Sequence, residues 1–266
     1  DKWTLKQLVP QMNDNNARYY YRDTFSSSEV DDDSGPNHEI IMLLSMFHVS
    51  FPTQIYKNWM NAALFYIYNN KNLSSADYRH YLRNLSKSYM LDRYLLPDDK
   101  KLSFDEIIYE NKGLAKHSVN DIVWGNINID EKQHPGENIE NFVFNFYDYI
   151  LWTEQKNIDF DFSYRTSVEH FYPQHPTDRE SLDWNYLQSF GNLCLISRGM
   201  NSKFTNNLPK AKNENFGDPE MMKNYSLKLR SMMNCIKMNE MWDKSKIEEK
   251  EQEAKDRIKD YLEKIV

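Results

Sequence analysis

The sequence is poor in cysteine, glycine and proline, and each shortage excludes a class of protein. Cys194 and Cys235 are its two cysteines, which are too few for a disulfide scaffold or a four-cysteine zinc site. So few thiols favour a reducing, cytoplasmic location. Seven glycines and nine prolines among 266 residues are few for a many-turned β protein, so we expect a helix-rich chain.

Long apolar runs, glycine-rich loops and repeats are also missing. The longest apolar run, 40–47, is far shorter than the roughly 20 residues that cross a bilayer, so no membrane contact is expected. We find no signal peptide, no internal repeat and no glycine-rich phosphate loop, so the chain is not expected to hydrolyse a nucleotide itself. It begins at Asp1 without a methionine, and we expect it to be part of a longer protein.

Aromatic residues are plentiful, at 14% of the chain, and supply bulk for a core. Hydrophobic spacing and capping residues predict six longer helices. These helices are expected at 38–49, 54–69, 75–96, 138–156, 218–236 and 244–265. Residues 1–37 are expected to form an opening helix and a loop, with Tyr19, Tyr20 and Tyr21 buried; a base-stacking platform is the alternative.

The last of these helices carries an apolar stripe with spacings of three and four residues, as in a coiled-coil seam. The stripe consists of Ile247, Ala254, Ile258, Tyr261 and Ile265, with the charged Glu251 in the remaining place. Such a stripe can dock on its own domain or pair two chains into a homo-oligomer. The sequence leaves both open.

One stretch, 165–212, combines two short strand-like runs with a polar segment. The run 166–172 is β-prone and ends at Pro173, and a second apolar run, 192–197, is followed by the strand-breaking Gly199. The pattern predicts two short strands followed by a helix that begins near Asn201. Polar side chains lie at the ends of these elements.

The residue types at those ends suit phosphodiester hydrolysis. Such a reaction needs a base for water and a cation for the charge that grows on the phosphate. His170 is a candidate base, because an unperturbed histidine has a pKa of about 6.5. Glu169 and Asn201 offer the hard oxygen ligands that Mg²⁺ prefers. The alternative role of Asn201 is to cap the following helix. Glu169 and His170 are neighbours and would face opposite sides of a flat strand, so they can serve one site only if the strand ends or bends near Pro173.

The spacing of these residues resembles a known nuclease motif. The motif begins with an acid–His–x–x–Pro element. It continues with Asn–Leu and with a second asparagine nine residues later, which a lysine follows closely. This order is similar to that of the HNH, or His-Me finger, nucleases. The longer segments VEHFYPQ and GNLCLISRGMNSKFTNNLPKAK resemble the C-terminal nuclease domain of the GmrSD-type modification-dependent restriction endonucleases. The resemblance is strongest over about 141–262.

The resemblance implies a mostly α fold with an embedded ββα-metal finger, a helical N-terminal region at 1–137 and a nuclease region at 138–266. It also implies His170 as the general base, Glu169 and Asn201 as metal ligands, and Asn192 as the residue that pins the loop by hydrogen bonds. The metal would be Mg²⁺, with Mn²⁺ as the alternative. The sequence departs from the wider group in having Glu169 rather than Asp, and in a long connection of 22 residues from His170 to Asn192.

The charge of the chain is unusual for a DNA enzyme. Its net charge is −7, whereas phosphate contacts normally come from clustered lysine and arginine. Between residues 191 and 213, however, there are four cations and no acid: Arg198, Lys203, Lys210 and Lys212. These four are the candidate phosphate-binding residues, and an ordinary solvated loop is the alternative.

The sequence therefore predicts a metal-dependent DNA endonuclease acting in restriction or phage defence. The resemblance implies a further partner, an N-terminal nucleotide-dependent domain that senses DNA. A non-catalytic DNA- or protein-binding module on a degenerate HNH fold and an RNA-directed nuclease are the alternatives. The intact glutamate, histidine and asparagines favour catalysis.

Overall fold

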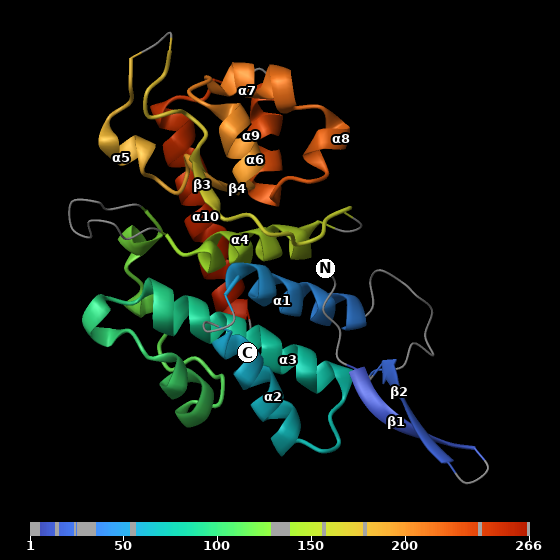
Figure 1. Cartoon of the computed structure of the whole chain (residues 1–266). Coiled ribbons are helices and arrows are strands. Elements are labelled where there is room, and N and C mark those ends of the chain that lie inside the picture. The colour runs from blue at the N-terminus through green and yellow to red at the C-terminus, as the bar shows by residue number, and fades with distance from the viewer. Residues whose placement is uncertain are drawn as a thin grey trace.

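The computed structural model describes residues 6–13, 16–23, 25, 36–53, 57–128, 139–155, 158–177, 180–238 and 241–264. Helices form most of this part of the chain, which confirms the mostly α prediction (Figure 1). The helices are α1 (Pro36–Ser50), α2 (Asn58–Asn69), α3 (Ser75–Ser88), α4 (Asn141–Glu154), α5 (Trp184–Leu187), α6 (Arg198–Phe204), α7 (Pro209–Phe216), α8 (Pro219–Met222), α9 (Leu227–Lys237) and α10 (Lys244–Lys264). The strands are β1 (Lys6–Asn13), β2 (Asn16–Asp23), β3 (Ser167–His170) and β4 (Leu193–Ile196), and they form two separate antiparallel pairs.

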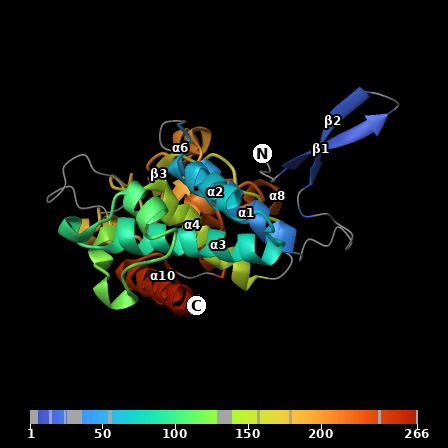
Figure 2. The same cartoon turned by 90° about the horizontal axis from the view of Figure 1, so that it is seen from below.

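The opening helix predicted for the N-terminal region is wrong. Strands β1 and β2 form a hairpin there, because the tyrosine-rich run suits a pleated strand better than a helix. Figures 1 and 2 show the hairpin projecting from the helical body. Tyr19, Tyr20 and Tyr21 are 64%, 44% and 75% exposed, so their predicted burial is also wrong. The predicted domain boundary near residue 137 lies outside the described residues.

The larger of two hydrophobic cores joins the two halves of the chain. It combines apolar residues of α1 and α3 with those of α4 and α10. Helix α4 is buried on nearly all sides, since ten of its residues, 142–151, are buried. It also contacts β4, so this aromatic helix lies behind the second strand of the site.

Capping residues set the helix bounds. Ser74 and Asp77 form a capping box at the start of α3, as predicted, and the helix continues into a π-helical segment, Tyr89–Leu95, before Pro97. The single helix predicted for 218–236 is wrong. It is divided into α8 and α9, because Asp218 caps the first and Ser226 caps the second.

The apolar stripe of α10 is buried against the chain's own core. Ile247, Ala254 and Ile258 of the predicted stripe are fully buried, Tyr261 is partly buried against the larger core, and Ile265 lies outside the described residues. The described part of the stripe therefore docks on its own domain, and pairing of two chains through this helix stays a prediction. Within the described residues, none of the helices has the length and apolar character needed to span a bilayer.

Strand β4 lies between the larger core and a smaller one. All four of its residues are buried, and they alternate: Leu193 and Leu195 belong to the larger core, whereas Cys194 and Ile196 belong to the smaller. This alternation follows from the two-residue repeat of a strand. The smaller core is otherwise built from α6 to α9 and the segments around β3 (Figure 1). The β3–β4 pair thus has helices on both sides and is held rigidly.

Candidate active site

The candidate site is built on β3, β4 and α6, in the strand–strand–helix order that the sequence predicts. The two strands pair from Ser167↔Ile196 to His170↔Leu193. Only Ser197 separates β4 from α6, and its hydroxyl accepts a hydrogen bond from the backbone N–H of Met200, which caps the helix. Helix α6 contacts β3.

Glu169 and His170 occupy the end of β3 and contact different neighbours. The ladder ends at His170, and the backbone bends at the next two residues. Glu169 pairs with Cys194 on the side of the smaller core, while His170 pairs with Leu193 on the other side. Because the strand stops here, both side chains lie at the same edge of the sheet even though they leave opposite faces.

Glu169 is held by a buried lysine. The ammonium of Lys212 donates to Glu169 Oε1 at 2.7 Å, to the carbonyl oxygen of His170 at 2.8 Å and to that of Phe171 at 3.0 Å. The Lys212 side chain is 0% exposed and that of Glu169 is 11% exposed. The ammonium also lies over the Phe204 ring of α6, 5.3 Å from its centroid, so Lys212 links β3 to α6.

Lys212 was predicted to bind phosphate, which requires an exposed ammonium, but the structure buries it. All three of its N–H donors are used within the protein. The sequence contains a sign of this burial that we missed: on α7, Lys212 is four residues from Leu208 and four from Phe216, both of which pack against the smaller core. It therefore lies in the apolar row of that helix.

Burial and ion pairing oppose each other in this pair. Burial raises the pKa of Glu169, and the neighbouring Lys212 ammonium lowers it. Burial likewise lowers the pKa of Lys212, and Glu169 raises it. Burial is the larger effect on each partner, so the pKa of Glu169 lies above its usual value and that of Lys212 below, while the attraction and the short hydrogen bond limit both shifts.

Asn192 is fully buried and uses its whole amide. Its Oδ1 accepts from the backbone N–H of Tyr172 at 2.8 Å and from the indole N–H of Trp242 at 3.2 Å. Its Nδ2 donates to the carbonyl oxygens of Tyr172 and Leu187 at 3.0 and 3.1 Å. The side chain thus ties the segment after β3 to the turn before β4.

His170 contacts the long connection between the two strands. Its Nε2 lies 3.0 Å from Oε1 of Gln188, and Gln188 is only 2% exposed. Gln188 ends α5, where its backbone N–H bonds the carbonyl oxygen of Trp184. Sequence reasoning missed Gln188, because 18 residues separate it from the imidazole.

The turn before β4 is fixed by α10. A Cβ at Gly191 would lie 2.1 Å from the carbonyl oxygen of Ile247 and 2.9 Å from the backbone nitrogen of Glu251, so only glycine fits there. Ser189 donates to Glu251, and Asn128 bridges Glu251 and the Phe190 N–H. Glu251, the charged residue that interrupts the apolar stripe of α10, therefore holds the turn before β4 in place.

Asn201 and three of the candidate cations lie on the surface of the same unit. Arg198, Asn201 and Lys203 are exposed on α6, and the Lys210 side chain on α7 is 83% exposed and pairs weakly with Glu214 at 3.9 Å. The alternative capping role of Asn201 is wrong, since Ser197 caps α6 and Asn201 lies inside its first turn. The three cations are accessible to a polyanion.

The donor set suits a hard cation with few protein ligands. Glu169 Oε1 is bonded to Lys212, and within the described residues no hydrogen bond reaches Oε2. That oxygen and the exposed amide oxygen of Asn201 are of the hard type that Mg²⁺ binds while keeping several waters. In the described ranges, no three or more His, Cys, Asp or Glu side chains come together in a group that could hold a metal ion.

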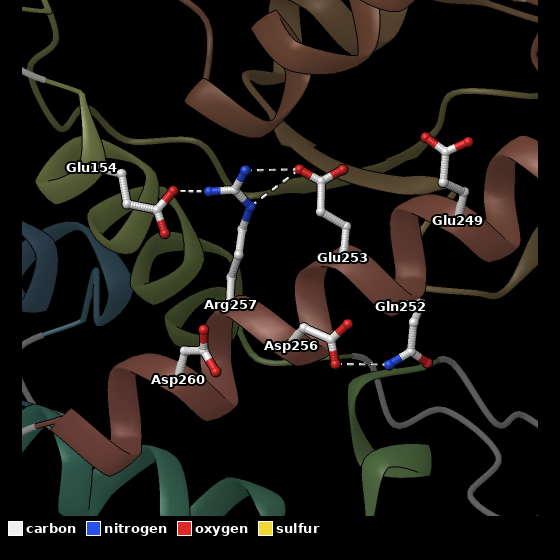
Figure 3. A pocket seen from close by; sticks show the side chains of 7 residues that line it. All are labelled: Glu154, Glu249, Gln252, Glu253, Asp256, Arg257 and Asp260. Carbon is white, nitrogen blue, oxygen red and sulfur yellow. Dashed lines mark hydrogen bonds and ion pairs between the residues drawn. The ribbon is translucent and has the colours of Figure 1, made fainter.

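A surface groove on α10 has the wrong charge for DNA. Its volume is about 610 Å³, and Figure 3 shows acidic side chains around a single arginine, Arg257. The groove is lined by Glu154, Glu249, Gln252, Glu253, Asp256, Arg257 and Asp260. Five carboxylates repel phosphate, so the nucleic acid path is expected on the α6–α7 side instead.

Comparison with known proteins assigns the chain to a family. A model of the family described as GmrSD restriction endonucleases, C-terminal domain, matches residues 96–254, which is more than half of the chain. The match contains Glu169, His170, Asn192 and Asn201, and it begins earlier than the segment from about residue 141 on which the sequence resemblance rested. Searches among curated proteins and among solved structures returned no match. The chain belongs to the family of GmrSD restriction endonuclease C-terminal domains.

Proposed function

We propose that the chain is an HNH-type, metal-dependent endonuclease that hydrolyses phosphodiester bonds of DNA at the end of β3. One observation supports this most: a single β3–β4–α6 unit holds Glu169 and His170 at a strand end, Asn192 in the turn before the second strand and Asn201 on the helix. The family agrees, since its members are described as parts of restriction endonucleases.

In the proposed mechanism, His170 takes a proton from the attacking water, and Asn192 keeps the segment after β3 in register with the turn before β4. Glu169 Oε2 and the Asn201 amide oxygen would hold the cation, Mg²⁺ or alternatively Mn²⁺. When bound, that cation supplies positive charge for the phosphate and the leaving oxygen. Arg198, Lys203 and Lys210 are exposed beside this unit and would bind the DNA backbone.

The proposal extends to a role in restriction or phage defence in the cytoplasm. In this proposal an N-terminal nucleotide-dependent domain supplies recognition of the DNA, and this chain supplies the cut. The family description supports the restriction role. The two cysteines, Cys194 and Cys235, are buried thiols that do not form a disulfide, in keeping with a reducing compartment.

Plasmid nicking in Mg²⁺ tests the proposal. His170→Ala should slow nicking by at least about 100-fold, the usual contribution of a general base, while the melting temperature stays within a few degrees. His175→Ala is the matched control, because this histidine is exposed five residues away and should be dispensable. Wild-type rates in pure His170→Ala protein would remove the proposed base.

One observation favours a second function, a non-catalytic DNA- or protein-binding module. Lys212 already neutralises Glu169, as it would in a site that holds no cation. The same assay separates the two: DNA retention without any metal-dependent nicking supports the module. Parallel digestion of plasmid and structured RNA tests the RNA-directed alternative.

A further inference from the structure

The contact between His170 and Gln188 has a chemical consequence for the proposed nuclease. The amide oxygen of Gln188 can only accept a hydrogen bond, so at 3.0 Å the ring must donate its Nε2–H. In a neutral imidazole the lone pair that takes up a proton is then on Nδ1. The contact therefore selects which nitrogen is basic.

Gln188 is held firmly enough to impose this choice. It is 2% exposed, and its backbone N–H is bonded to Trp184 and Tyr186 at the end of α5. Its neighbours are fixed as well: the Leu187 carbonyl accepts from Asn192, and Ser189 is bonded to Glu251. A side chain on so constrained a backbone loses little freedom when it binds the ring.

The position of Gln188 also gives a purpose to the long connection between the strands. The chain runs 22 residues from His170 to Asn192, and α5 lies within it. This excursion is what returns residue 188 to the imidazole. A shorter connection would join the strands equally well but would bring no side-chain amide to His170.

We propose that Gln188 is a positioning residue for the general base: it accepts the Nε2–H of His170 and thereby fixes the ring orientation and the tautomer whose lone pair is on Nδ1. The inference rests on the proposed function for its catalytic meaning, whereas the tautomer itself does not depend on catalysis. Partners of this kind, which hold the second nitrogen of a functional histidine, typically contribute about 10–100-fold to activity.

Nitrogen-15 NMR of histidine-labelled protein tests the tautomer without any activity. The His170 signals are assigned by their loss in His170→Gln, and the wild type should show the Nε2–H form. Gln188→Leu should shift the ring to a mixture of tautomers. An Nδ1–H ring in the wild type, or an unchanged tautomer in Gln188→Leu, would overturn the proposal.

Kinetics then separate positioning from mere structural support. Gln188→Leu should lower the nicking rate about 10–100-fold with the Mg²⁺ dependence unchanged. Gln188→Glu keeps an oxygen acceptor beside the ring, so it should retain the Nε2–H tautomer and nick DNA faster than Gln188→Leu does. Gln252→Leu, on the distant acidic groove, is the control and should match the wild type.

The outcomes remain distinguishable. A wild type that never nicks DNA defeats the proposed nuclease function, while the NMR result still decides the role of Gln188. An active enzyme in which Gln188→Leu nicks DNA at the wild-type rate, or in which Gln188→Glu is as slow as Gln188→Leu, overturns the positioning role, whatever the melting temperatures of the variants.

Discussion

Replacing Lys212 with methionine should destabilise the protein strongly and make its stability depend on pH. The substitution leaves the Glu169 carboxylate 11% exposed without its cation, and two carbonyl oxygens without a donor. Removing one partner of a buried ion pair costs about 3–5 kcal/mol, and the residual exposure of Glu169 favours the lower end. For a chain of this size, about 3 kcal/mol corresponds to a fall of about 6–12 °C in Tm.

The pH dependence has a definite sign. Burial already raises the pKa of Glu169, and loss of Lys212 removes the effect that lowers it. A carboxyl group whose folded-state pKa exceeds its unfolded value is best tolerated in the neutral form. The penalty should therefore be small below the unfolded pKa and reach its full size above the folded pKa.

Thermal or urea unfolding between pH 4 and pH 8 measures this effect. Lys210→Met is the matched control on the same helix: its weak, exposed pair with Glu214 should contribute less than about 1 kcal/mol. The double variant Glu169→Gln/Lys212→Met should lose the pH dependence and recover part of the stability. Equal stability of Lys212→Met and wild type across this pH range would refute the buried ion pair.

Two further substitutions test the surroundings of the site. Gly191→Ala should destabilise the protein by about 1–3 kcal/mol or more in a melting experiment, because the new methyl group meets the backbone of α10 at 2.1 Å. Gly199→Ala is the control in the same experiment, since a Cβ there meets nothing within 4 Å. Asp148 is fully buried, and burial raises its pKa to about 6 against the opposing charges of Arg165 and Lys228. Because its folded-state pKa exceeds the unfolded value, the wild type loses stability as the pH rises through this range. The free energy of unfolding of Asp148→Asn, measured by urea titration, should therefore rise relative to that of the wild type by at most about 3 kcal/mol between pH 4 and pH 7. A difference that stays constant with pH would contradict the raised pKa.

The helices and the order of the site elements could be predicted from the sequence because they follow from local patterns. Hydrophobic spacing placed α1 within two residues of its observed ends, and the Ser74–Asp77 capping box placed the start of α3. The nine-residue step from Asn192 to Asn201 leaves room for one strand, one cap and one helical turn, which is what the structure contains.

What the sequence could not supply depends on contacts between distant segments. The partner of Glu169 lies 43 residues away and that of His170 lies 18 residues away. A lysine beside three other cations has the pattern of a phosphate-binding cluster, and only the packing of α7 on the smaller core distinguishes Lys212 from Lys210. The hairpin β1–β2 was missed because the tyrosine run was interpreted as core material, although it lies exposed on a projecting strand.

In the proposed mechanism, Glu169 and Asn201 share one cation beside His170. The most direct measurement is anomalous diffraction from a crystal of the protein soaked in Mn²⁺, compared with a crystal of Glu169→Gln/Asn201→Ala treated in the same way. We expect a single anomalous peak between the Glu169 carboxylate and the Asn201 amide in the wild type and none in the variant. A wild-type crystal without a peak at these two side chains, or an equal peak in both crystals, would contradict the metal-dependent nuclease.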